Sequence, residues 1–225
     1  MEKEKEENNH NKYKIMMLGE QAVGKSSLVL RYTKNKFQYN IMGTAGLDLK
    51  KKELQINNEN INVIIYDSAG HDRFRKISEV QFKGSDGLIL VYDTTDNKTL
   101  DWILEWLDKI KNNGEDKNME LLIVGNKIDL PNKIIKYEDA CKKIEKYNIE
   151  LIETSALTGE NVENVFANII NKIYSHKHNY LTNKNKNANE IINNENNEFF
   201  STEKIGINLN KNGKDKKKKG CCSSQ

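Results

Sequence analysis

The sequence predicts an α/β fold with a mostly parallel, six-stranded sheet and helices on both faces. Between residues 13 and 174, short apolar runs alternate with stretches in which apolar residues recur at helical spacing. Two of the runs, 88–92 and 121–124, are apolar throughout, which is typical of strands buried on both faces. Because alternating strands and helices favour parallel pairing, we expect ligands at the carboxyl ends of the strands.

The elements follow one another in a regular order. An apolar run at 13–18 predicts the first strand, and a glycine-containing loop leads from it into a helix. The segment 57–60, Asn-Asn-Glu-Asn, predicts the turn of a hairpin. The expected strands are 13–18, 48–56, 62–66, 88–92, 121–124 and 149–152, and the expected helices are 24–34, 100–110, 137–147 and 162–174.

Charge is unevenly distributed along the 225 residues. From residue 176 onward there are ten lysines and five acidic residues, a net +5, while residues 1–175 hold 26 basic and 28 acidic side chains, a net −2. The distal part is rich in Asn and Lys, which bury little apolar surface. We therefore expect a disordered N-terminus at 1–12, one domain at 13–175 and a disordered tail at 176–225. So small a net charge on the domain argues against nucleic-acid binding.

Signals for export or membrane insertion are missing from the sequence. The longest apolar run, 88–92, is far shorter than the ~20 residues that span a bilayer, and the charged segment 1–7 is no signal peptide. Glu2 excludes N-terminal myristoylation, which needs glycine. Cys141 and the adjacent Cys221 and Cys222 suggest no disulfide framework. We expect a cytosolic protein that does not cross a membrane.

A phosphate-binding loop follows the first predicted strand. The segment from Gly19 to Ser26 fits the pattern G-x-x-x-x-G-K-S/T, whose glycines let backbone N–H groups face phosphate oxygens beside a helix N-terminus. Lys25 can reach the β- and γ-phosphates, and Ser26 can ligate Mg²⁺. A plain glycine turn is the alternative, but the strand–loop–helix context favours a nucleoside triphosphate. The predicted nucleotide-binding residues here are Gln21, Ala22, Val23, Gly24, Lys25, Ser26 and Ser27.

Further segments resemble the Ras superfamily of small GTPases, and the resemblance implies that the base is guanine. The segment 126–129, Asn-Lys-Ile-Asp, matches the N-K-x-D motif, in which the Asp129 carboxylate accepts the N1 and N2 protons of guanine and Lys127 covers the base. The segment 155–157, Ser-Ala-Leu, resembles the motif whose central N–H binds O6, and Phe37 lies where an aromatic ring stacks on the base. Read alone, the polar residues of 126–129 could equally be turn formers. The implied base-binding residues are Phe37, Asn126, Lys127, Asp129, Ser155, Ala156 and Leu157.

The same resemblance implies a metal site and a switch. The segment 67–70, Asp-Ser-Ala-Gly, is similar to the D-T-A-G motif, in which Asp67 holds a water of Mg²⁺ and the Gly70 N–H senses the γ-phosphate. Thr44 lies where the superfamily has the threonine that coordinates the ion, so Ser26, Thr44 and Asp67 form the implied Mg²⁺ site. Loss of the γ-phosphate would release Thr44 and Gly70 and loosen both flanking loops.

Within the superfamily the sequence is most similar to the Rab family. The stretches 73–78 and 90–95 resemble two segments that set Rab proteins apart. The resemblance implies a monomeric, membrane-anchored GTP/GDP switch of vesicle traffic on the cytosolic face of the Golgi, endoplasmic reticulum or endosome, with a soluble cytosolic pool. The implied partners are an exchange factor, a GTPase-activating protein, a GDP-dissociation inhibitor and effectors. Tyr66 and the segments 44–49 and 81–85 depart from the Rab pattern, so particular effectors do not carry over.

Position 71 departs from the family in a way that bears on catalysis. Small GTPases normally carry Gln there to position the attacking water, whereas this chain has His71. The implied catalytic residues are His71, Gly70 and Lys25. An imidazole cannot accept from the water and donate toward the phosphoryl group as one amide can, so we expect slow intrinsic hydrolysis. Gln21, where many family members have Gly, crowds the phosphates and favours the same result.

Three alternatives to an ordinary GTPase switch stay open. His71 could act as a general base. A protein that hardly hydrolyses GTP could act as a membrane scaffold in its GTP state. A P-loop ATPase or nucleotide kinase would let ATP compete with GTP, against which Asn126 and Asp129 argue.

Two cysteines near the end predict a lipid anchor. Cys221 and Cys222 resemble the paired cysteines that are geranylgeranylated in Rab proteins, and no aliphatic C-a-a-X pattern follows them. One lipid chain anchors only marginally, so a second chain or nearby basic residues are needed. Lys216–Lys219 would each add roughly 1 kcal/mol near an anionic leaflet. The alternative is a solvated charge run beside two spare thiols.

Overall fold

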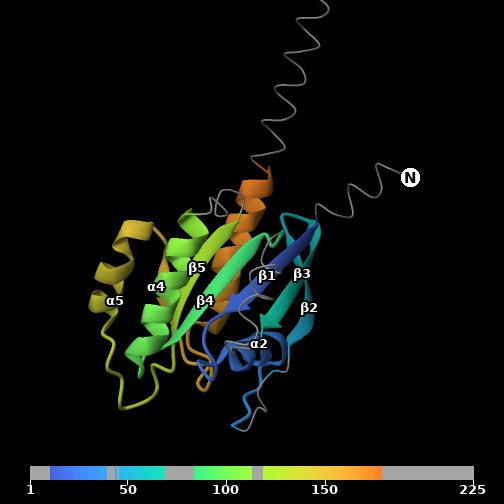
Figure 1. Ribbon diagram of the computed structural model, residues 1–225. Helices are drawn as coiled ribbons and strands as arrows, with labels where there is room; N and C mark the ends of the chain where they lie inside the picture. The colour runs from blue at the N-terminus through green and yellow to red at the C-terminus, as the bar shows by residue number, and fades with distance from the viewer. Residues whose placement is uncertain (1–10, 40–43, 45, 69–83, 113–118, 179–225) are drawn as a thin grey trace, which may run out of the picture. The chain divides into compact units, whose positions relative to one another are not determined.

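The computed structural model describes residues 11–39, 44, 46–68, 84–112 and 119–178, in which helices flank a six-stranded sheet (Figure 1). The strands are β1 (Lys12–Leu18), β2 (Leu47–Ile56), β3 (Glu59–Ser68), β4 (Gly87–Asp93), β5 (Glu120–Asn126) and β6 (Leu151–Glu153). The helices are α2 (Lys25–Lys34), α4 (Asn97–Asn112), α5 (Tyr137–Ile144), the 3-10 turn η3 (Glu145–Tyr147) and a last helix at 162–178. The α/β fold class predicted from the sequence is confirmed.

The strands lie in the order β2-β3-β1-β4-β5-β6. β2 and β3 pair antiparallel, while the pairs β1–β3, β1–β4, β4–β5 and β5–β6 are parallel. The parallel strands therefore end at one edge of the sheet, and the loops that follow them converge there. An α/β sheet of this kind binds its ligands at that edge.

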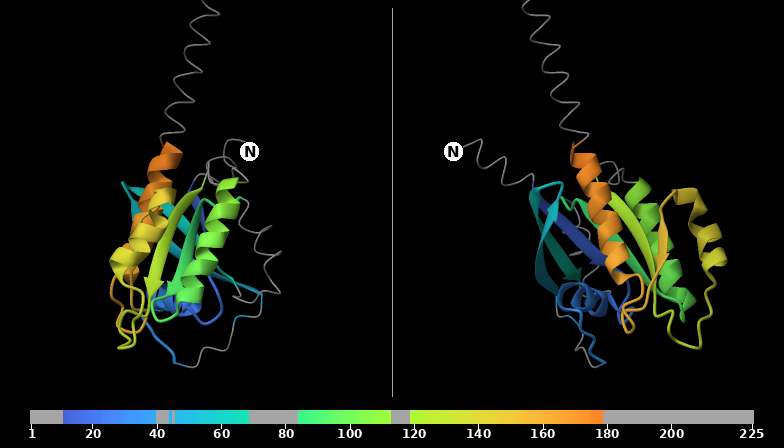
Figure 2. Two further views of the ribbon diagram at one scale, coloured as in Figure 1. Left: turned by 60° about the vertical axis from the view of Figure 1, so that its left-hand side comes forward. Right: turned by 180° about the vertical axis from the view of Figure 1, so that it is seen from behind.

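Two apolar cores cover the faces of the sheet. Along β1, Tyr13, Ile15 and Met17 join the core beneath α2 and the last helix, whereas Met16 and Leu18 join the core beneath α4 and α5. Figure 2 shows α4 and the last helix on opposite sides of the strands. Every residue of β4 is buried, as expected of a central strand with helices on both faces.

Several elements differ at their ends from the sequence prediction. β1 begins at Lys12, and the hairpin turn is only two residues long, because Glu59 already belongs to β3. Asn57 and Asn58 both have positive φ, 48° and 66°, as a type I′ turn requires. The helix expected at 137–147 ends at Ile144 and continues as η3, and the last strand lies at 151–153 instead of 149–152.

The last helix runs to residue 178, beyond the boundary at 175 that composition predicts. Acidic side chains from distant parts of the chain hold its final turn. The three pairs are His176 Nδ1 with Glu120 Oε1 at 2.8 Å, Lys177 Nζ with Asp86 Oδ1 at 2.9 Å, and His178 Nε2 with Glu59 Oε2 at 3.3 Å. Composition alone cannot reveal such pairs, because each joins residues far apart in sequence.

Candidate functional site

The loop between β1 and α2 has the backbone geometry of a phosphate-binding loop. Gly19, Ala22 and Gly24 have positive φ angles of 152°, 63° and 101°, so the chain curls tightly before α2 begins at Lys25. A Cβ at Gly19 would lie 2.2 Å from the Val91 carbonyl oxygen, so only glycine fits there. A curled backbone beside a helix N-terminus suits an anion.

Lys25 lies in the centre of this loop. Its side chain is 5% exposed, and Nζ donates to the carbonyl oxygens of Gly19 at 2.9 Å and Glu20 at 2.8 Å. Burial lowers the pKa of Lys25 to about 8, although the charges of Asp67 and Glu20 act to raise it. A phosphate beside the ammonium group would stabilise its charged form, so the buried cation is suited to an anionic ligand.

Three oxygen-bearing side chains converge beside Lys25. Ser26 Oγ and Thr44 Oγ1 are 2.9 Å apart, and Thr44 Oγ1 donates to Asp67 Oδ2 at 3.4 Å. Burial raises the pKa of Asp67, while the hydrogen bond from Ser26 and the charge of Lys25 act against that rise. Asp67 Oδ1 is buried and has no hydrogen-bond partner among the described residues. Hydroxyl and carboxylate oxygens, one of them unpaired, fit a Mg²⁺ ion that also binds phosphate.

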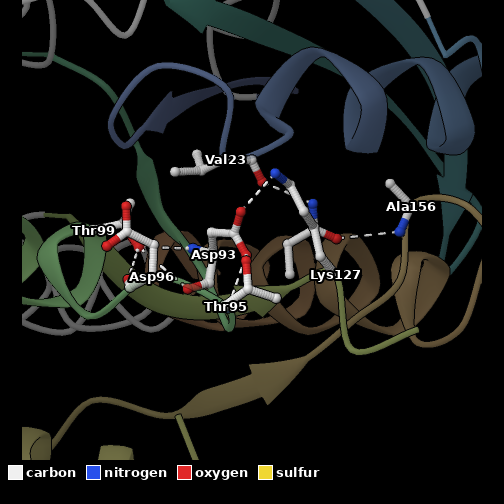
Figure 3. A network of polar contacts seen from close by, with 8 residues as sticks. Val23, Asp93, Thr95, Asp96, Thr99, Lys127 and Ala156 are labelled. Atoms are coloured by element: carbon white, nitrogen blue, oxygen red, sulfur yellow. Dashed lines mark hydrogen bonds and ion pairs between the residues drawn. The ribbon is translucent and has the colours of Figure 1, made fainter. Parts of the chain in front are cut away.

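The Asn126 side chain joins the phosphate-binding loop to the loop after β6. Asn126 is 1% exposed, and its Nδ2 donates to the Val23 carbonyl oxygen at 2.9 Å. Its Oδ1 accepts from the Ala156 N–H at 3.1 Å and from Thr154 Oγ1 at 3.2 Å. Figure 3 draws Val23 and Ala156, the two residues that this amide joins. One buried amide therefore fixes two loops that approach from different parts of the chain.

Asp129 and Lys127, which flank Ile128 after β5, are each held by a partner. Ser155 Oγ donates to Asp129 Oδ1 at 2.5 Å, which fixes one carboxylate oxygen. Lys127 Nζ forms an ion pair with Asp93 Oδ2 at 2.6 Å, visible in Figure 3. Burial acts to raise the pKa of Asp93, but the hydrogen bonds from Lys127 and Thr95 outweigh it and hold that pKa below its ordinary value.

The remaining predicted residues lie around these two centres. Gln21 and Ala22 are exposed on the loop, and Ser27 is half-buried in the first turn of α2. The N–H of Ala156 already donates to Asn126, so a base oxygen would have to share it. Phe37 packs against the core beneath α2 and lies edge-on to Tyr39, with ring centroids 5.1 Å apart. The carbonyl oxygen of Leu157 accepts from Arg31 Nη2 at 2.5 Å.

Four of the predicted catalytic, binding and lipidation residues lie outside the described residues, namely Gly70, His71, Cys221 and Cys222, and so do Lys216–Lys219. Two charged side chains that contact the site were not predicted to do so. Asp93 binds Lys127, and Arg31 binds the loop at 155–157. For Asp93, its place at the end of an all-apolar strand was a usable signal. For Arg31 there was none, since its acceptors are backbone carbonyls more than 120 residues away in sequence.

Comparison with known proteins gives one family. A model of the Ras family matches residues 14–175. The chain is 35% identical over 196 residues to Ras-related protein Rab11A of Lotus japonicus, an alignment that covers 87% of this chain and 84% of that protein. It is 35% identical over 216 residues to Ras-related protein RABA1c of Arabidopsis thaliana, covering 94% of each chain. It is 36% identical over 163 residues to Ras-related protein Rab-11A of Dictyostelium discoideum, covering 72% of this chain and 76% of that protein.

Proposed function

This chain belongs to the Ras family as a small GTPase of the Rab type, and on that premise we propose that it binds GTP and GDP through the residues described above. Membership makes it a GTPase of vesicle trafficking. Lys25 and the loop amides bind the phosphates, the Asp129 carboxylate accepts hydrogen bonds from the base, and Lys127 packs over the base.

The bridge made by Asn126 is the observation that carries the proposal. Its side chain donates to Val23 in the phosphate-binding loop and accepts from Ala156 in the loop after β6. A ligand that spans both loops must have an anionic end for Lys25 and a hydrogen-bonding end for Asp129. A guanine nucleotide has both, since its phosphates are anionic and its base presents two adjacent donors.

Base recognition can be tested at Asp129. Its Oδ1 already accepts from Ser155, so an Asn at this position keeps that acceptor and gains an amide donor in place of the second oxygen. Guanine presents donors at N1 and N2, whereas xanthine has a carbonyl in place of the 2-amino group. We expect Asp129→Asn to weaken GDP binding about a hundredfold and to favour xanthosine diphosphate, because a charged hydrogen bond is lost.

The experiment is competition binding of GDP, xanthosine diphosphate and ADP to the full-length chain. Asp139→Asn is the matched control, because Asp139 lies on α5 with its side chain 62% exposed, and it should leave all three affinities unchanged. Equal binding of ADP and GDP by the natural chain would contradict the proposed base, and so would unchanged GDP affinity in Asp129→Asn.

A bound Mg²⁺ ion would be held by Ser26, Thr44 and Asp67, and it would neutralise charge on the phosphates. The short distances among these three oxygens and the unpaired Asp67 Oδ1 support this site. In hydrolysis, Lys25 orients the β- and γ-phosphates and stabilises the negative charge on the transferring group. Ser26→Ala should weaken the response of GDP binding to added Mg²⁺, and an unchanged response would count against the site.

His71 raises a second candidate function, a GTP-bound membrane scaffold that hardly hydrolyses its nucleotide. The support is the residue type, because an imidazole cannot both accept from a water and donate toward the phosphoryl group as one Gln amide does. Single-turnover GTP hydrolysis by the natural chain and by His71→Gln separates the two functions. We expect a slow natural chain that the substitution accelerates, whereas equal rates would mean that His71 is a tolerated replacement.

Membrane attachment is proposed through geranylgeranyl groups on Cys221 and Cys222, aided by Lys216–Lys219. No helix in the described part of the chain is long and apolar enough to cross a bilayer. Replacing Cys221 and Cys222 together by Ser should move the protein from the membrane fraction of cells to the cytosol. Cys141→Ser is the control and should leave it attached. Attachment that survives the double substitution would exclude the lipid anchor.

The proposed setting is the cytosolic face of an endomembrane, with a soluble pool carried by a GDP-dissociation inhibitor. An exchange factor would open the nucleotide site, and a GTPase-activating protein would accelerate hydrolysis and so compensate for His71. Effectors would bind the GTP state of a monomer. These partners come from the family and have no counterpart among the contacts described above.

A further inference from the structure

We propose that Arg31, on α2, is a positioning residue for guanine recognition that acts on Asp129 through the loop after β6. The inference rests on the proposed guanine site and adds a residue that couples the phosphate-binding helix to base selectivity. Arg31 lies six residues after Lys25, about 9 Å along the same helix. A rigid helix thus carries both a phosphate-binding lysine and the arginine that holds the base loop.

The Arg31 guanidinium group is held on two sides. On one side Nε donates to the Ala156 carbonyl oxygen at 3.0 Å, and Nη2 donates to the Leu157 carbonyl oxygen at 2.5 Å. On the other side Nη1 donates to the backbone oxygen of Asn35 at 3.2 Å and to its Oδ1 at 3.3 Å. This planar fork matches two consecutive carbonyls, which a flexible ammonium group cannot do equally well.

A chain of hydrogen bonds leads from Arg31 to Asp129. The carbonyl of Leu157 shares a peptide group with the N–H of Thr158, and in a trans peptide the two point in opposite directions. The Thr158 N–H donates to Ser155 Oγ at 3.0 Å, and Ser155 Oγ donates to Asp129 Oδ1 at 2.5 Å. Hydrogen bonds in series polarise one another, so the positive charge at one end strengthens the bond that orients the carboxylate at the other.

A second contact acts on the same loop. Arg31 holds the carbonyl of Ala156, while the N–H of Ala156 donates to Asn126 Oδ1. The Gly159 N–H closes the loop by donating to the Ser155 carbonyl oxygen at 2.8 Å. Losing Arg31 would leave two carbonyls without their charged donor and would free the loop that carries Ser155.

Inosine diphosphate is the nucleotide that isolates this effect. It has the phosphates, N1–H and O6 of GDP but lacks the 2-amino group. The ratio of GDP to inosine diphosphate affinity therefore reports how well Asp129 is aligned with that group, because a site built to hydrogen-bond a group rejects the analogue without it. If Arg31 had only a structural role, its loss would weaken the binding of both nucleotides by the same factor and leave the ratio unchanged.

The test measures dissociation constants for GDP, inosine diphosphate and ADP on the full-length chain. The variants are Arg31→Ala, Arg31→Lys and Lys34→Ala, the last as a control that removes the same charge from the last turn of the same helix. Thermal unfolding at saturating GDP verifies that each variant is folded.

We expect Arg31→Ala to lower the ratio of GDP to inosine diphosphate affinity about tenfold and Arg31→Lys to lower it by a smaller factor. Lys34→Ala should have the same ratio as the natural chain. An unchanged ratio in Arg31→Ala, or an equal fall in Lys34→Ala, would overturn the positioning role. The proposed function would survive that result as long as the natural chain prefers GDP to ADP. If the natural chain bound ADP as tightly as GDP, both the proposed function and the positioning role of Arg31 would be overturned.

Discussion

Replacing Asn126 by alanine should both destabilise the protein and release its nucleotide. The substitution removes one donor and two acceptor contacts, and it leaves the Val23 carbonyl, the Ala156 N–H and the Thr154 hydroxyl without their partner. All three residues are at most 4% exposed. At about 1–3 kcal/mol for each buried group left unpaired, and with water refilling part of the space, we expect a loss of about 3–6 kcal/mol in the free energy of unfolding. That is a large share of the ~5–15 kcal/mol available to a domain.

The assay is urea unfolding of the full-length chain at saturating GDP and Mg²⁺, followed by the dissociation rate of a fluorescent GDP. Asn168→Ala is the matched control, because the hydrogen bonds from Asn168 Nδ2 to Glu150 are exposed and should be worth less than about 1 kcal/mol. If Asn126→Ala costs no more than this control and releases GDP at the natural rate, then Asn126 does not couple the two loops and the reasoning fails.

Three further predictions concern the loop, its lysine and the hairpin. The pKa of Lys25 is lowered to about 8 in the free protein, and a bound phosphate would raise that pKa. GDP affinity should therefore be full below pH 8 and fall as the pH rises through 8, and a binding titration between about pH 7 and pH 9 that shows no fall would contradict this. Gly19→Ala should lower the free energy of unfolding in urea by about 3 kcal/mol, because its Cβ would lie 2.2 Å from the Val91 carbonyl oxygen. Gly46→Ala, where φ is 93° but no described atom lies within 4 Å of the added Cβ, should cost about 1 kcal/mol, and equal costs would refute the clash. Asn58→Gly should gain about 0.5 kcal/mol, seen as a raised melting temperature, since the turn holds that residue at φ 66°; a lowered melting temperature would count against the turn assignment.

The fold was predictable because its signals are local. The apolar run 88–92 within β4, the glycines before α2 and the helical spacing of apolar residues in α4 each appear within a few positions of the sequence. The differences lie where distant residues decide the outcome. The last helix continues through His178 because acids on other elements pair with its final turn.

In the site, too, residues within short motifs were predictable, whereas contacts between distant residues were not. A motif match predicted Lys25 as a site residue, and the resemblance to small GTPases predicted Asn126 and Asp129, because each lies in a short pattern that can be recognised within a few positions. The coupling between these motifs was not predictable, since the hydrogen bond from Asn126 to Val23 spans 103 residues and that from Arg31 to Leu157 spans 126. A backbone carbonyl is an acceptor at every position, so no residue type marks the one that Arg31 binds.

This site is proposed to bind a guanine nucleotide and hydrolyse it. Single-turnover phosphate release from GTP, with an equal concentration of ATP offered in a parallel reaction, tests that claim most directly on the full-length chain with Mg²⁺. We expect slow hydrolysis of GTP, its loss in Lys25→Ala, and no hydrolysis of ATP. Hydrolysis of ATP at the same rate as GTP would contradict the proposal.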